Sequence, residues 1–304
     1  IDGRRTYGVW ASGNTANASN SYNVTANSTY GNATGITATA YGDAIASNSG
    51  VVDVDGYNAA TGVFAYSYAG HATAENNGGM VYADALGTAY GVSAFAVHGD
   101  ASAHNSGFVQ ANAQFGVAVG VYANTVFGND ADVANSGTVV ANGDAAGVGM
   151  FVGGASASAT NDNWVQASAS AGDGFAAGIL AVGNDLSATN NAYVDVRGTY
   201  ATGIDVRAGD SAYVANNANV WVTGVEATGI SAVAAAEDGL ATVVNHGNVL
   251  VTADGNGTGI QVVARGYHGD AHIDNTGNVN VGGAYASGAL QGLVSRDAGA
   301  LSAR

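Results

Sequence analysis

The chain has 304 residues, with 47 glycines, 8% aromatic residues, no proline, no cysteine and a formal net charge of −16. This composition excludes disulfides and an ordinary globular core, and it argues against nucleic acid and anionic lipid as partners, because Lys and Arg bind phosphates. The negative net charge favours cations as ligands. No apolar run approaches the roughly 18–20 residues of a membrane helix, so no membrane insertion of this segment is expected.

A repeat of about 28 residues runs through the chain, and each unit begins with a glycine followed, in most units, by Ile or Val. The distance from Gly8 to Gly288 is 280 residues in ten steps. Apolar residues alternate after this glycine, as at Ile204 and Val206, which predicts a short strand. The intermediate members are Gly35, Gly62, Gly91, Gly120, Gly147, Gly178, Gly203, Gly229 and Gly259.

An acidic corner follows that strand in many units. Its aspartates are Asp43, Asp100, Asp130, Asp185, Asp210, Asp238 and Asp270. The last four belong to consecutive units, and carboxylates stacked about 5 Å apart repel each other unless a cation lies between them. Calcium suits such hard oxygen ligands, so Asp185, Asp210, Asp238 and Asp270 form the predicted metal edge. Ordinary Gly-Asp turn chemistry is the alternative.

A second strand ends at an asparagine that recurs with the same period. Small or apolar residues stand two and four positions before it, and another apolar residue stands four positions after it, as in Ala101, Ala103, Asn105 and Val109. These even offsets are typical of strands with one buried face. The series is Asn20, Asn48, Asn76, Asn105, Asn135, Asn161, Asn190, Asn216, Asn245 and Asn275.

Stacking the units buries the apolar positions and places these asparagines about 4.8 Å apart, so that their amides can form a hydrogen-bonded ladder in the core. A solvent-facing turn asparagine is the alternative. The glycine two residues later is expected at a corner with positive φ. Its members are Gly50, Gly78, Gly107, Gly137, Gly247 and Gly277.

The pattern predicts an all-β parallel β-solenoid of about ten coils, with residues 1–304 as a single domain. One coil of about 28 residues with three strands is favoured over two coils of about 14, because the glycine and asparagine strands differ consistently in chemistry. Ten such coils would form a rod of about 50 Å.

The segment from Asn135 to Asn161, NSGTVVANGDAAGVGMFVGGASASATN, resembles the repeats of bacterial autotransporter passengers and related large surface adhesins. The resemblance extends over nearly the whole chain. It implies a right-handed parallel β-helix, an extracellular or cell-surface location, and an adhesive or scaffolding role toward a cell surface, a glycan or a matrix. It transfers no catalytic residues, so a non-enzymatic protein is expected.

Two other functions stay open. Recognisable repeats reach close to both ends of the sequence, which would also suit a secreted filament assembled end to end by self-association. Polysaccharide-degrading β-helix enzymes place Asp and Arg on an outer face, where this chain has Asp195 with Arg197 and Asp205 with Arg207. The tyrosines at outward or corner positions, such as Tyr122, are expected to stack between coils or to contact sugars.

Overall fold

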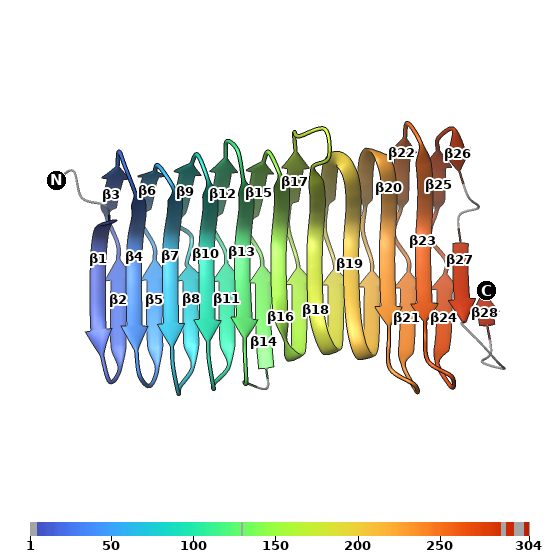
Figure 1. Ribbon diagram of the computed structural model, residues 1–304, viewed down its shortest axis with the longest axis horizontal. Coiled ribbons are helices and arrows are strands. Elements are labelled where there is room, and N and C mark those ends of the chain that lie inside the picture. The colour runs from blue at the N-terminus through green and yellow to red at the C-terminus, as the bar shows by residue number, and fades with distance from the viewer. Residues whose placement is uncertain (1–4, 129, 287–289, 295–300, 304) are drawn as a thin grey trace.

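The computed structural model describes residues 5–128, 130–286, 290–294 and 301–303, and these residues form one right-handed parallel β-solenoid. In Figure 1 the nearer strands β1, β4 and β7 run downward and the farther strands β3 and β6 run upward while the chain advances from left to right, which is a right-handed path. Each repeat is one coil of three strands, as predicted. The described residues contain no helix that could cross a membrane.

The first face of the coil consists of the strands that contain the recurring glycine. They are β1 (Arg5–Gly13), β4 (Asn32–Ala40), β7 (Ala59–Ser67), β10 (Thr88–Ala96), β13 (Val117–Thr125) and β23 (Asn256–Ala264), and β27 (Leu290–Val294) continues the face beside β23. Four longer strands turn a corner without a break and so belong to two or three faces. They are β16 (Ala146–Asn161), β18 (Phe175–Asn190), β19 (Val194–Asn216) and β20 (Val220–Ala234).

The second face ends at the asparagine series. Its separate strands are β2 (Ala16–Asn20), β5 (Ala44–Asn48), β8 (Ala72–Asn76), β11 (Ala101–Asn105), β14 (Asp130–Asn135), β21 (Leu240–Asn245), β24 (Asp270–Asn275) and β28 (Leu301–Ala303). Copies in adjacent coils pair in parallel, and the asparagines stay level, as Asn76, Asn105 and Asn135 do.

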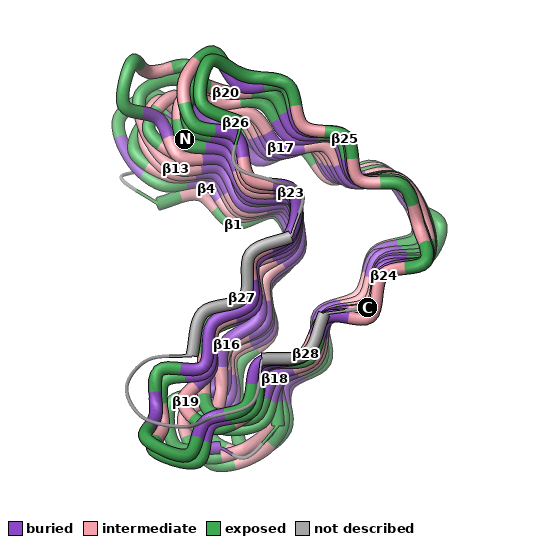
Figure 2. The backbone as a smooth tube through the Cα atoms, turned by 90° about the vertical axis from the view of Figure 1, so that its right-hand side faces the viewer, coloured by how far each residue is buried: buried purple, intermediate pink, exposed green. Residues whose placement is uncertain are grey.

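The third face completes the coil. Its separate strands are β3 (Asn23–Ser28), β6 (Val51–Gly56), β9 (Met80–Ala85), β12 (Phe108–Ala113), β15 (Thr138–Gly143), β17 (Val165–Ala169), β22 (Val249–Ala253) and β25 (Val279–Gly282). The short β26 (Tyr285–Ala286) then pairs with the start of β23. Figure 2 shows the three faces around a narrow interior, with the first face recessed between the turns on either side.

The core is thin because small side chains fill it. The first face contributes one stacked row of larger residues, including Ile36, Val63 and Ile204, while the second face contributes mainly alanines and the third mainly valines. The asparagine ladder is present in this interior, as predicted. From Asn48 to Asn245 its members are 0–2% exposed.

The recurring glycine is required by a close contact between faces. A Cβ atom at Gly178 would lie 2.3 Å from Cγ1 of Val194 on the third face and 2.6 Å from the carbonyl oxygen of Gly203 in the next coil. The residue that takes this place in its coil is Gly149, level with Gly120, so the assignment of Gly147 was wrong. Gly288 lies outside the described residues.

The prediction of positive φ at the corner glycines was wrong for all but one position. Among the described glycines, only Gly78 has positive φ, at 76°. At Gly50 the constraint is instead contact between coils, because a Cβ atom there would lie 1.9 Å from the carbonyl oxygen of Tyr22 in the preceding coil.

Candidate functional site

A hollow on the first face, across β1, β4, β7, β10 and β13, is lined by aromatic and hydroxyl side chains. It has a volume of about 520 Å³. Its lining residues are Tyr7, Trp10, Thr34, Thr37, Thr39, Thr61, Phe64, Tyr66, Tyr90, Ser93, Phe95 and Tyr122. We call this the aromatic hollow.

Strand alternation places these side chains outside. In β7 the buried Val63 and Ala65 alternate with the outward Phe64 and Tyr66, and Tyr66 is level with Phe95 in β10. The rings of Tyr66 and Phe95 lie 5.8 Å apart, with an angle of 4° between their planes. Parallel pairing of successive coils thus brings together two aromatic rings that are 29 positions apart in sequence.

The rest of the hollow is polar but uncharged. The Oγ1 atom of Thr37 is buried and has no hydrogen-bond partner, although the residue lines the hollow and is 4% exposed. Burial raises the pKa of Tyr90, and burial together with Tyr90 raises the pKa of Tyr122 to about 12. Both phenols are therefore neutral at ordinary pH and offer hydroxyl groups.

Farther along the same face, across β19, β20 and β23, the lining becomes charged. A second hollow of about 640 Å³ contains Asp205, Arg207, Gln261 and Arg265. A guanidinium nitrogen of Arg207 lies 2.6 Å from a carboxylate oxygen of Asp205, whose side chain is 3% exposed. The other predicted pair forms on the third face, with 2.9 Å between Arg197 and Asp195.

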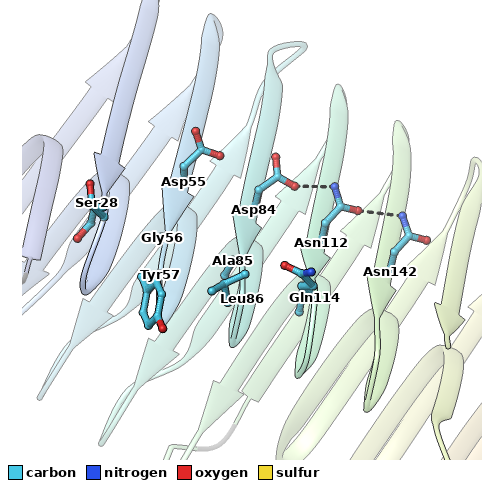
Figure 3. A pocket seen from close by; sticks show the side chains of 12 residues that line it. Ser28, Asp55, Gly56, Tyr57, Asp84, Ala85, Leu86, Asn112, Gln114 and Asn142 are labelled. Atoms are coloured by element: carbon cyan, nitrogen blue, oxygen red, sulfur yellow. Dashed lines mark hydrogen bonds between the residues drawn. The ribbon is translucent and has the colours of Figure 1, made fainter. Parts of the chain in front are cut away.

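An acidic hollow of about 470 Å³ lies along the third face (Figure 3). Asn112 donates a hydrogen bond to Asp84 at 2.6 Å, and Asn142 donates to Asn112 at 2.9 Å. One carboxylate oxygen from each of Asp53, Asp55 and Asp84 lies within 4.8 Å of the others. Burial raises the pKa of Asp55, and the charges of Asp53 and Asp84 raise it further.

The four aspartates of the predicted calcium edge are not brought together. Asp185 is level with Ser211, Ser211 with Leu240, and Leu240 with Asp270. Asp210 therefore lies one residue before the position that is level with Asp185, and Asp238 lies two residues before the position that is level with Asp270. The coil length varies: the ladder asparagines from Asn190 to Asn275 are separated by 26, 29 and 30 residues. Among the described residues, the one acidic group with metal-ligand spacing is that of Asp53, Asp55 and Asp84.

Aromatic stacking between coils occurs at the corners as well. Tyr41 and Tyr68 lie 5.5 Å apart, and His98 and Phe127 lie 5.3 Å apart. The sequence interpretation included Tyr122 but missed the rest of the aromatic hollow. The signal was present in the outward positions after the recurring glycine, where Phe64 and Tyr66 follow Gly62.

Comparisons with protein-family models, with curated proteins and with solved structures found no match for this chain. The class of protein is therefore defined by its own architecture, a right-handed parallel β-solenoid with an internal asparagine ladder.

Proposed function

We propose that this protein is an adhesive β-solenoid of the extracellular space or the bacterial cell surface, comparable in role to an autotransporter passenger. One observation carries the proposal: the fifteen tyrosines, seven phenylalanines and three tryptophans all lie among the described residues, and none of them is fully buried in the core. Alanine, valine and isoleucine fill the core instead.

Exposed aromatic residues favour recognition because they bury much apolar area in a contact at little cost in conformational entropy. Several are widely exposed, including Trp10 at 62% and Phe127 at 72%. Parallel pairing holds them on a rigid scaffold, so a partner meets a preformed surface and less ordering cost opposes binding.

The test is adhesion of the intact chain. Beads coated with the protein are applied under flow to cultured cells, extracted matrix and immobilised polysaccharide, and attached beads are counted. Attachment to at least one surface above that of albumin-coated beads is expected, with a clear decrease for a variant in which exposed aromatics of one face are replaced by serine. Attachment no better than albumin on all three surfaces would contradict an adhesive role.

The filament alternative stays a prediction. Electron microscopy of the same preparation over a concentration series tests it, since self-association by stacking would yield fibres whose length grows with concentration.

A further inference from the structure

We propose that the aromatic hollow binds an uncharged polysaccharide whose chain lies along the axis of the rod. This inference rests on the proposed adhesive function and names the ligand class of one of its surfaces.

The lining determines the chemistry of the ligand. Although the chain has 23 acidic residues, none of the described residues that line this hollow is charged. Aromatic rings such as Tyr66 and Phe95 offer apolar surface, and Thr34, Thr61 and Ser93 offer hydroxyl groups beside it. A pyranose ring has matching features, with apolar C–H faces and a rim of hydroxyl groups. An ionic ligand would find no opposite charge here.

Two other extended polymers fit less well. Single-stranded nucleic acid also stacks on aromatic side chains, but it requires a positively charged groove. An extended peptide binds by adding a strand to a free sheet edge. Among the described strands under the hollow, β4, β7 and β10 are each paired on both sides, and β1 pairs with β4 alone. A strand added beside β1 would run across the rod axis at one end of the hollow, so it would not contact the successive coils in turn.

The buried hydroxyl of Thr37 is a second, independent indication. Buried polar atoms are nearly always hydrogen-bonded, and leaving one unsatisfied destabilises the protein. The Oγ1 atom of Thr37 has no partner in the free protein. A sugar hydroxyl seated between Trp10 and Phe64, which line the same hollow, would provide a partner once the Thr37 side chain turns toward it.

The direction of the ligand follows from the repeat. Successive coils place level outward side chains about 4.8 Å apart along the axis, as with Tyr66 and Phe95, while Tyr122 in the next coil is level with Ser93. Consecutive sugar units of an extended polysaccharide advance by a similar distance, so one chain can contact several coils in turn. Affinity should therefore increase with the length of the oligosaccharide.

The experiment is a titration of the full chain with neutral oligosaccharides: β-1,4-glucan, β-1,3-glucan and α-1,4-glucan, each as a disaccharide and a hexasaccharide. Calorimetry and the fluorescence of Trp10, compared with a Trp10→Phe variant, report binding. We expect one series to bind, with the hexasaccharide at least about tenfold tighter than the disaccharide and with little dependence on salt. This dependence of affinity on oligosaccharide length is measured on the unmodified protein, so it does not require that any variant folds.

A matched pair of variants locates the site. Tyr66→Ala with Phe95→Ala should weaken hexasaccharide binding about tenfold, because it removes both rings of the stacked pair from the contact surface. Trp164→Ala, which removes an aromatic from the third face, should leave it unchanged.

Three results would overturn the inference: no binding by any neutral series, equal affinity for disaccharide and hexasaccharide, or equal losses for the two variants. Tighter binding of an acidic polysaccharide or of an extended peptide would also overturn it. If coated beads attach to a protein surface while these titrations fail, adhesion stands and the glycan assignment falls.

Discussion

The side-chain amide of Asn76 donates a hydrogen bond to the Oδ1 atom of Asn105 at 2.8 Å, and both side chains are buried. The relation repeats from Asn20 to Asn275, with every amide donating toward the C-terminal end of the rod. Each ladder asparagine thus links two neighbours, and several also bond the turn that follows, as Asn105 does with the carbonyl oxygen of Gly107.

Asn105→Ala should lower the free energy of unfolding by about 1–3 kcal/mol, because it leaves one buried N–H of Asn76 without its acceptor and removes one of the hydrogen bonds accepted by Asn135. Urea denaturation followed by circular dichroism measures the change. The matched control is Asn248→Ala, which interrupts an exposed asparagine row between Asn219 and Asn278. Water can satisfy those partners, so the control should change stability little, and equal losses would contradict the role given to burial.

Gly178→Ala should destabilise the protein by about 1–3 kcal/mol, because the new methyl group would overlap Val194 and force the first and third faces apart. Gly172→Ala provides the contrast. A Cβ atom there would meet nothing within 4 Å, and its φ is not positive. That variant should be neutral or more stable by about 0.4–1 kcal/mol, because alanine restricts the unfolded chain. Thermal unfolding compares the two, and the opposite order would refute the contact argument.

Asp55→Asn should make the protein more stable at pH 7. The pKa of Asp55 is raised above 3.8 in the folded state by burial and by Asp53 and Asp84, so the folded protein holds this proton more tightly than the unfolded chain does. The associated stability is present below the ordinary pKa of Asp and is lost as the pH rises through the raised value.

The advantage of Asp55→Asn should therefore be absent near pH 3 and grow as the pH is raised, which denaturation midpoints across that range would show. Asp173→Asn removes the same charge from an exposed turn and serves as the control. Equal gains from both variants would mean that net charge, rather than the local cluster, sets the effect.

Arg207→Ala should cost about 1–3 kcal/mol, since it removes the charged partner of the nearly buried Asp205 carboxylate. Adding Asp205→Asn to it should recover most of the loss, because the amide carries no charge that needs compensation. Chemical denaturation of the single and double variants measures the recovery. A double variant as unstable as Arg207→Ala alone would show that the arginine acts by packing and not by pairing with Asp205.

Much of the fold could be predicted from the sequence, because its signals are local and repeated. Alternation around Asn105 assigned the strand and its buried side, and the regular spacing of the asparagines required stacked coils in which their amides meet. The glycine before Ile204 marked a strand but not its start, since Gly203 lies inside β19 and the shorter strands of this face begin three residues before their glycine. The reason for this glycine, contact with Val220, could not be read from spacing, since the two residues lie on different faces.

The outer surface was decided by the tertiary structure. Asp185, Asp210, Asp238 and Asp270 looked equivalent in sequence, but unequal coil lengths separate them, while Asp55 and Asp84 fall level in adjacent coils. The sequence by itself determined what lies inside, because a core position is repeated in every coil and tolerates few residue types. Which outward side chains become neighbours on the surface depends on the register between coils and on the recessed shape of the first face. Both arise only when the three faces pack together.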